Sequence, residues 1–378
     1  MGSPLYLTLL MGPVEAVPAP KPMMDALTSA EVHVSATGKS GFQLVFTLAN
    51  SSPLQTFFLL AQGALVPPIR VILVATFGGL PQVLMDGIVT RTEVVPDAMS
   101  GSSQLNVTGD DLTALMGLVD FSGLPYPALT PDLRVAAIIG KYAAFGIVPN
   151  ALPVVTPYAD APTERIPSQK GTDLDYIQEL AKAAGYIFYI TPGPVPGMSV
   201  AYWGPQIKIG VPQPALNVNM DTWTNVESLN FQIEPQTATM PVVYIQDPNT
   251  GATIPVGLPS TNPLQPPLGL FVPIAQTVEN LKDTAKLPTA QALMTGIAKA
   301  AQSADVVSGD GTINVLRYGQ ILQARQLVGV RGAGLAFDGL YYVDSVKHNL
   351  KFGEYKQSFT LKRNALVSNV PVVPTMPF

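Results

Sequence analysis

Alternating apolar and polar residues in the first hundred positions predict strands. Ile69–Phe77 is apolar on both faces and rich in β-branched residues, as in a buried strand. Val83–Val95 is expected to be a long strand in which Gly87 marks a bulge or a close backbone approach. Ser100–Val107 can pair with it. A further strand is predicted over Gly41–Ala49, where the alternate apolar residues share one face: Phe42, Leu44, Phe46 and Leu48.

Helical spacing replaces the alternation after residue 107. Asp110–Leu118 predicts a short helix. A second helix is expected from Pro131 to about Phe145, because Thr130 can cap it and proline suits a first helical turn. Several prolines follow, up to Pro167.

The clearest helix of the chain is predicted over Asp173–Ala184. Thr172 can cap its start, Asp175 stands in the third position, and Gly185 can end it. Strands are expected next, at Tyr186–Thr191 and Ser199–Trp203. The helix has one apolar face, formed by Leu174, Ile177, Leu180, Ala181 and Ala184.

Strands dominate the remainder of the chain, which ends as an antiparallel meander. Asp247–Pro273 carries seven prolines and predicts a long loop, or an arm that reaches a neighbour. A helix is expected over Thr289–Ala301, with Thr289 as its cap, and Ser303–Thr312 is expected to be a turn region. The predicted strands are Ala215–Val218, Val226–Ile233, Gln320–Ala324, Gln326–Arg331, Leu340–Asn349 and Tyr355–Arg363.

These elements predict an α+β, β-rich chain: two β-rich bodies with an inserted α/β piece. The expected boundaries are 1–107 for the first body, completed by about 200–233, and 108–199 for the insertion. The second body spans 234–366 and includes the proline-rich loop and the helix at 289–301; a tail covers 367–378. No repeat of 20–50 residues is visible, which excludes propellers and solenoids.

Composition points to a covered surface. Only 12% of the residues are charged, against about 25% in an ordinary globular protein, while mean hydropathy is +0.28. Interface cores lose charged residues, so burial against other subunits explains this better than an unusually apolar monomer. The net charge of −5 lacks the basic footprint of a non-specific nucleic-acid binder. The 32 glycines and 37 prolines disfavour a helical bundle.

No signal peptide or membrane insertion is expected. Leu5–Met11 is apolar, but no positive region precedes it and Gly12-Pro13 stops it early. Leu54–Phe77 has the strongest membrane-span hydropathy, yet Arg70 and Pro67-Pro68 interrupt it. It is interpreted as an apolar segment, a turn and a strand.

Candidate catalytic or metal-binding residues are few. The chain has no cysteine and two histidines, His33 and His348, so thiolate chemistry is excluded and no metal site or cofactor is expected. His348 is predicted to be a strand histidine that is satisfied by a hydrogen bond. The acid pairs Asp110-Asp111 and Asp173/Asp175 are interpreted as helix-start residues rather than as the two carboxylates of a glycosidase.

Three weaker patterns have structural interpretations as well. Gly332-Ala333-Gly334 is expected to be a turn, because Phe337 takes the third glycine position of a dinucleotide loop. Asp305 and Asp310 lack calcium-loop spacing. Trp203 and Trp223 are interpreted as buried strand aromatics rather than as a sugar platform.

Three segments resemble a known family. Gly87 lies in Met85–Val89, a hairpin-like pattern after a buried strand; Asp173, Leu180 and Gly185 lie in the predicted helix, and Gly204 follows in Tyr202-Trp203-Gly204. The third segment is the closing hairpin, with Gly339, Tyr341, Val343, His348, Tyr355, Phe359, Leu361 and Arg363. Over residues 1–366 the chain is similar to hub proteins of contractile tails: the T-even baseplate hub, the late control protein D and the N-terminal part of VgrG-type spikes.

The resemblance implies two tube-like antiparallel β-barrel domains per chain and a homotrimer. Such a ring joins a six-fold inner tube protein to a three-fold spike and lines a channel for DNA or protein cargo. Because the chain ends soon after the hairpin, the spike is expected to be a separate protein. The expected place is a phage tail baseplate, or an injection particle assembled in the bacterial cytoplasm, with other baseplate proteins as partners. Alternatives are a tube initiator or distal-tail protein, or a carbohydrate-acting β-protein.

Overall fold

The computed structural model describes residues 5–48, 68–96, 103–154, 166–246, 252–258, 265–287 and 289–369. Parts of several predictions lie outside these residues, among them the apolar stretch 54–67, the start of the strand expected at Ser100, positions 247–251 and 259–264 of the expected loop, and the tail from residue 370 onward. Most of the described strands belong to antiparallel sheets, which confirms the expected α+β, β-rich class. Among the described strands, the main sheet is an open path and not a closed barrel.

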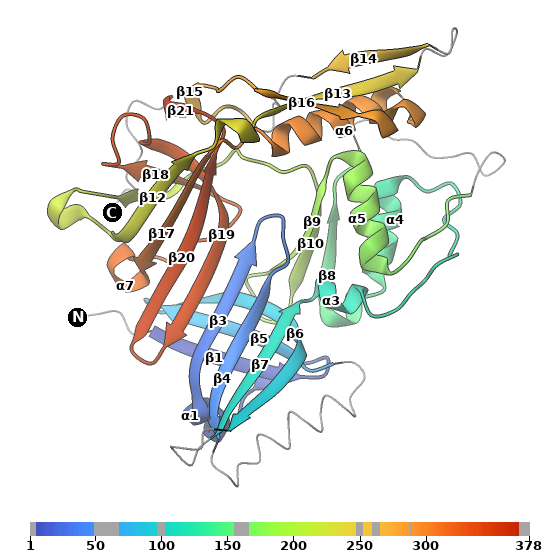
Figure 1. Ribbon diagram of the computed structural model, residues 1–378. Helices are drawn as coiled ribbons and strands as arrows, with labels where there is room; N and C mark the ends of the chain where they lie inside the picture. Colours follow the sequence, from blue (N-terminus) through green and yellow to red (C-terminus); the bar gives the residue numbers. More distant parts are fainter. Residues whose placement is uncertain are drawn as a thin grey trace.

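Four neighbouring strands form a first unit, in the lower part of Figure 1. Every neighbouring pair in it is antiparallel. The alternation predicted for Gly41–Leu48 is confirmed, because its alternate apolar side chains are buried. In spatial order the strands are β3 (Leu27–Ser35), β4 (Gly41–Leu48), β7 (Ser103–Asp111) and β6 (Leu80–Pro96).

Further strands fold over the first unit and enclose its core. β5 (Arg70–Phe77) pairs with the first half of β6, and β1 (Leu5–Gly12) pairs with β5. β2 (Val17–Pro18) flanks β1 and leads to α1 (Lys21–Ala26). The predicted buried strand is confirmed, since six of the eight residues of β5 are buried.

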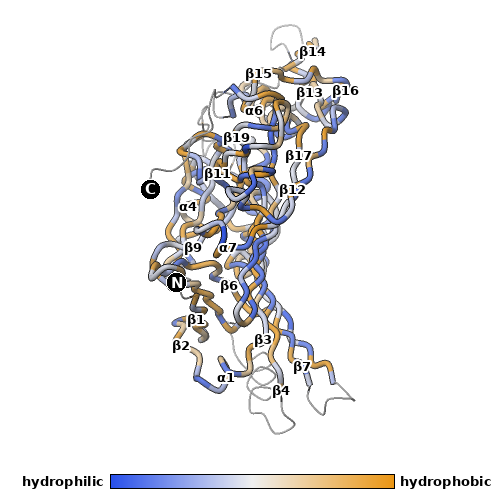
Figure 2. The backbone as a smooth tube through the Cα atoms, turned by 90° about the vertical axis from the view of Figure 1, so that its left-hand side faces the viewer, coloured by the Kyte–Doolittle hydropathy of each residue, from blue (hydrophilic) through white to orange (hydrophobic). Residues whose placement is uncertain are grey.

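A second unit of four strands stands beside the first. It also is antiparallel throughout. The two units are joined into one sheet where Ser345–Lys351 of the second pairs with Ser29–Ser35 of the first. The order of its strands is β12 (Val226–Ile233), β17 (Val307–Asn314), β20 (Glu354–Arg363) and β19 (Gly339–Lys351). Turned by 90°, the molecule is tall and narrow (Figure 2).

The second unit repeats the connectivity of the first. In chain order β12, β17, β19 and β20 correspond to β3, β4, β6 and β7, and every pairing within the units corresponds as well. β18 (Leu327–Arg331) pairs with the first half of β19, as β5 pairs with the first half of β6. One difference is that β11 (Gln213–Asn217) runs parallel to β18, whereas β1 is antiparallel to β5.

The β-bulges also correspond. The register shifts between Leu27 and Ser29 on β3, and between Val226 and Ser228 on β12. A second shift falls between Val89 and Arg91 on β6, and between Val343 and Ser345 on β19. Bulges are designed features of a sheet. Their coincidence fixes a residue-by-residue correspondence between the two units, which no repeat in the sequence indicated.

The inserted part packs helices on a small sheet, at the right of Figure 1. The predicted helix α5 (Asp173–Ala184) is confirmed with its capping box at Thr172 and a left-handed Gly185 that ends it. The helices before it are α3 (Thr113–Met116), α4 (Pro131–Gly140) and the 3₁₀ turn η1 (Ala143–Phe145). The sheet contains β8 (Ile147–Ala151), β10 (Ser199–Gly204) and β9 (Ile187–Pro192).

A third sheet covers the top of the second unit in Figure 1. It consists of β14 (Thr253–Gly257), β13 (Thr239–Gln246) and β16 (Thr277–Leu281), with α6 (Thr289–Gln302) against β13. Beside it, β15 (Gly269–Phe271) pairs with β21 (Leu366–Ser368). The remaining short elements are α7 (Val315–Tyr318), η2 (Asp221–Trp223), η3 (Pro235–Thr237) and η4 (Lys282–Lys286).

Several predictions of elements were wrong. Ser303–Thr312 is not a turn region, because Val307–Asn314 forms β17, a central strand of the second unit. The long loop expected after Asp247 contains β14 and β15, and Gln320–Ala324 forms no strand. Thr289 is the first residue of α6 rather than its cap. β3, β13 and β16 were not predicted, since short or mixed patterns hid them. The segment 200–233 was expected to complete the first body, but its strand β12 pairs with β17 of the second unit.

Candidate functional site

One face of the joined sheet is polar across both units. In antiparallel strands, directly paired residues lie on the same face. Asn230, Asp310 and Thr360 follow one another across the second unit on this face, and Glu31 and Gln43 continue it in the first unit. The opposite face of the same strands carries the buried cores. The sheet therefore offers a broad surface of small polar and charged side chains.

Several charges on this face lie beside opposite charges. Lys347 Nζ is 2.7 Å from Glu31, and Lys362 Nζ is 2.9 Å from Asp344. Lys356 lies within 3.2 Å of two carboxylates. Each exposed pair adds at most about 1 kcal/mol to stability. Proteins retain nucleic acid when uncompensated Lys and Arg side chains neutralise its phosphates and release the condensed counterions. A surface of compensated charges is therefore poorly suited to retain it.

A buried ion pair ties the first unit to the insertion. Arg70 on β5 donates to both carboxylate oxygens of Asp86 on β6, at 2.7 and 2.6 Å. Ser199 at the start of β10 donates to the same carboxylate at 2.9 Å, and Arg70 also donates to the carbonyl oxygen of Gly197. Both charged side chains are nearly inaccessible. Sequence analysis noted Arg70 only as an interruption of an apolar run.

Further buried cations join segments that are distant in the chain. The Arg325 guanidinium donates to the Ser35 carbonyl oxygen and stacks 3.9 Å over the Tyr189 ring, and burial lowers its pKa. Lys208 Nζ lies 2.6 Å from Asp305 and is buried. Arg363 donates to the carbonyl oxygens of Leu268 and Asp338. These contacts fix the bodies of the chain against one another.

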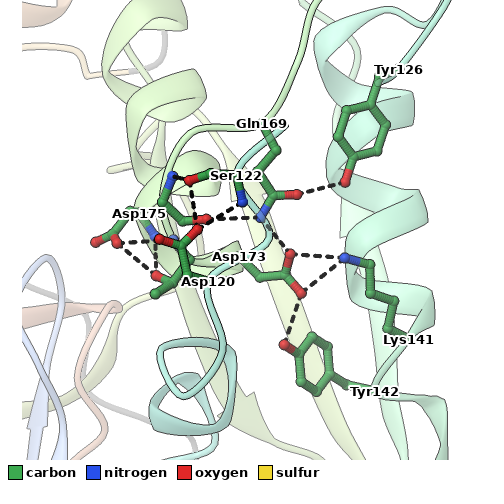
Figure 3. Close-up of polar contacts among 10 residues, drawn as sticks. Asp120, Ser122, Tyr126, Lys141, Tyr142, Gln169, Asp173 and Asp175 are labelled. Carbon is green, nitrogen blue, oxygen red and sulfur yellow. Dashed lines mark hydrogen bonds and ion pairs between the residues drawn. The ribbon is translucent and has the colours of Figure 1, made fainter. Parts of the chain in front are cut away.

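Asp173 is the centre of a polar cluster in the insertion (Figure 3). Its oxygens accept hydrogen bonds from Lys141 Nζ at 2.9 Å, Gln169 Nε2 at 2.7 Å and the Tyr142 hydroxyl at 2.9 Å. Gln169 in turn accepts from Tyr126, whose pKa is raised to about 12 by burial and by the charge of Asp173. Every group has a structural partner, so the cluster anchors the start of α5.

In the two acid pairs, Asp111, Asp173 and Asp175 each accept hydrogen bonds from nearby groups. Asp175 accepts from the Thr172 backbone and hydroxyl, which confirms the interpretation as a capping residue. Asp173 is also in the first turn of α5, as interpreted, and its carboxylate forms an ion pair with Lys141 across the insertion. Asp111 accepts from Thr113 at the start of α3, and burial raises its pKa. Asp110 precedes it at the same end of β7 and lies on the polar face.

His348 lies inside the second unit, as predicted for a satisfied strand histidine. It is buried, with Nδ1 2.7 Å from the Tyr355 hydroxyl and 3.3 Å from Gln357 Nε2. Burial, and then the nearby His33, lower its pKa to about 3. The imidazole is therefore neutral at ordinary pH.

The residues of the family resemblance are distributed through the fold and do not converge. Gly87 lies where a side chain would meet the Asp110 carbonyl oxygen at 2.2 Å, which confirms the predicted close approach. Asp173, Leu180, Gly185 and Gly204 belong to the insertion. The others belong to the hairpin β19–β20: Gly339, Tyr341, Val343, His348, Tyr355, Phe359, Leu361 and Arg363. All of these positions support packing.

The remaining candidates have structural roles. Among the described residues no group of three His, Asp or Glu side chains is arranged to hold a metal ion. Asp310 accepts from Thr360, and Gly332 and Gly334 adopt positive φ in a turn, as predicted. Trp203 is buried, whereas Trp223 is 68% exposed on η2, so the prediction of a buried Trp223 was wrong. No helix of the described part is long and apolar enough to cross a bilayer.

Comparison with solved structures places the fold. No family model and no curated protein matches the chain. A tail protein from Neisseria meningitidis MC58 matches with a TM-score of 0.63 at 12% identity, covering 96% of this chain and 98% of that one. The 43 kDa tail protein of prophage MuSo2 from Shewanella oneidensis gives 0.62 at 15% identity, over 96% and 100%.

A VgrG-containing structure matches too. The Francisella PdpA–VgrG complex gives a TM-score of 0.57 at 10% identity, over 99% of this chain and 55% of the matched chain. At these identities the likeness concerns the fold. The chain thus has the fold shared by phage and prophage tail proteins and VgrG, as its helix and closing hairpin indicated.

Proposed function

We propose that this protein is the hub of a contractile-tail or injection-system baseplate. Three copies form a ring that joins the six-fold inner tube to a separate three-fold spike. The observation that carries the proposal is the internal duplication: one chain holds two four-stranded units with the same pairings and bulges. Three such chains present six similar units to the tube and three identical chains to the spike.

The accessible surface supports an assembled state. Large apolar side chains such as Leu270, Phe271 and Ile274 are more than half exposed near the third sheet. Monomeric soluble proteins rarely leave such patches open. Tube, spike and other baseplate proteins are the proposed neighbours.

The polar face of the sheet is proposed to line the channel. Its charges are compensated at short range, as for Lys347 with Glu31 and Lys362 with Asp344. Cargo such as DNA or protein passes such a wall without being retained, because retention of DNA requires cations that are not already paired with carboxylates. The role is mechanical, with no catalysis and no cofactor, within a phage tail or an injection particle.

Native mass spectrometry combined with co-purification tests the proposal. The expected species is a trimer of the 40.0 kDa chain that binds a tube protein and a spike protein encoded beside it. A trimer that binds the tube but no spike would point instead to a tube-initiating or distal-tail protein. A monomer that binds neither would overturn the proposal.

A further inference from the structure

One edge of β6 is left partly unpaired by the strands that the structure describes. β7 accompanies one side of β6 along Gly87–Pro96, but β5 accompanies the other side only as far as Ile88. Among the described strands, none pairs with the far side of Arg91–Pro96. Unpaired backbone groups at a strand edge are a template for another strand.

β12 ends the other side of the same eight-strand surface. It pairs with β17 and with no other described strand. Natural edge strands are protected by lysine, proline or extreme shortness. β12 spans eight residues and contains neither lysine nor proline. Its outer edge is therefore also suited to pairing.

The second unit shows what fills the edge of β6. β19 is the strand that corresponds to β6. Its first half pairs with β18, and its second half, Ser345–Lys351, pairs with β3. The strand that corresponds to β3 is β12. The occupied junction between the units of one chain is thus a template for the open edges.

We infer that β12 of a second copy pairs antiparallel with Arg91–Pro96 of β6. The inference rests on the proposed ring and specifies its subunit contact. The coincident bulges also give the register of this pairing. Within one chain Lys347 lies opposite His33, and the corresponding pair between two copies is Glu93 opposite Gln232. In the same way, His348 opposite Val32 corresponds to Val94 opposite Phe231.

Side-chain chemistry fits this register. On the core side, Val94 meets Phe231 and Thr92 meets Ile233; Ile233 is 41% exposed in the single chain and gains cover. On the polar side the exposed Glu93 meets Gln232. At the end of the pairing, Arg91 lies opposite Glu234, so the charges are complementary.

This contact also explains how copies close into a ring. Different edges meet, β12 of one copy and β6 of the next, so the contact is heterologous and generates rings when the rotation closes. Around such a ring, first and second units alternate, and the polar face continues from copy to copy.

Cysteine cross-linking tests the register directly, since the chain contains no cysteine. The full-length double variant Glu93→Cys/Gln232→Cys is expected to form disulfide-linked dimers and trimers under mild oxidation. The matched control is Glu93→Cys/Ser228→Cys. Ser228 lies on the same face of β12 but four residues away, about 13 Å along the strand, too far for a disulfide.

The expected result is a yield of linked species on the order of ten-fold higher for the first variant than for the control. Native mass spectrometry of the reduced proteins is measured alongside. A trimer without the specific cross-link, or with equal linking of both variants, overturns the strand pairing and leaves the ring intact. A reduced protein that stays monomeric and does not link removes both proposals.

Discussion

Core-facing positions of β4 in the first unit are Phe42 and Leu44, and their counterparts on β17 in the second unit are Gly309 and Gly311. Larger side chains on the neighbouring strands fill the space that these two glycines leave in the core. A side chain at Gly309 would meet Phe231 of β12, and one at Gly311 would meet Phe359 of β20. In the first unit the arrangement is reversed, because Phe42 lies over Gly109 of β7. Cores tolerate such exchanges when total volume is kept.

The two cores differ in polarity as well. Leu105 and Val94 of the first unit correspond to Gln357 and His348 of the second. The side-chain amide of Gln357 accepts a hydrogen bond from the backbone N–H of Leu322 and donates one to its carbonyl oxygen. His348 is hydrogen-bonded to the Tyr355 hydroxyl. The comparison teaches that strand order, bulges and register define this fold, whereas the side chains that fill it are interchangeable. It also explains why the duplication leaves no repeat in the sequence.

The largest expected effect concerns the ion pair beside the first unit. Arg70→Met leaves the buried Asp86 without its counter-charge, so we expect a loss of about 3–5 kcal/mol in the free energy of unfolding. Urea unfolding at neutral pH measures it. The control is Lys347→Met, which removes the exposed pair with Glu31 and should cost about 1 kcal/mol or less. Equal costs for both variants would contradict a structural role for Arg70.

The polar core of the second unit predicts a pH dependence from His348, whose counterpart in the first unit is the apolar Val94. The folded pKa of His348 is about 3, below its ordinary 6.5. Its contribution to stability is therefore complete above pH 6.5 and declines as the pH falls toward 3, by about 1.4 kcal/mol per pH unit. Between pH 6.5 and 4.5, His348→Gln should abolish a decline of up to about 2.7 kcal/mol.

The readout for His348 is the slope of unfolding free energy against pH, because the substitution itself also changes stability. His33→Gln is the comparison variant: burial lowers the pKa of His33 on the polar face as well, so its share of the slope is measured separately. If wild-type protein and His348→Gln lose stability equally over this range, the buried neutral imidazole is refuted.

A smaller effect compares glycines of the two units. Gly109→Ala brings a side chain within 2.3 Å of the Ile88 carbonyl oxygen and of Phe42, whereas the nearest atoms to a side chain at Gly309 are ring atoms of Phe231, at 2.9 Å. We expect about 1–3 kcal/mol for the first substitution and less for the second. Thermal unfolding of both variants measures the difference. The reverse order would show that the second core is the more tightly packed.

Much of the fold could be predicted from local pattern. The helix at Asp173–Ala184 and the closing hairpin follow from spacing, capping and alternation, which are local signals. β17 escaped prediction because Gly309, Asp310 and Gly311 are turn residues by composition, and only Phe231 and Phe359 from other strands make glycine suitable there.

The interaction surfaces could be predicted only in part. Low charge indicated a covered exterior, but the open edges of β6 and β12 depend on long-range strand order, which no local pattern contains. The buried contacts of Arg70 and Arg325 likewise join residues more than one hundred positions apart, Gly197 and Ser35 respectively.

Cryo-electron microscopy of the assembled protein, reconstructed without imposed symmetry, tests the central claim most directly. The account predicts a three-fold ring in which first and second units alternate and the face bearing Glu31, Thr360 and Lys347 lines the central opening. A ring with this face turned outward, or particles of single chains in the presence of the tube protein, would contradict it.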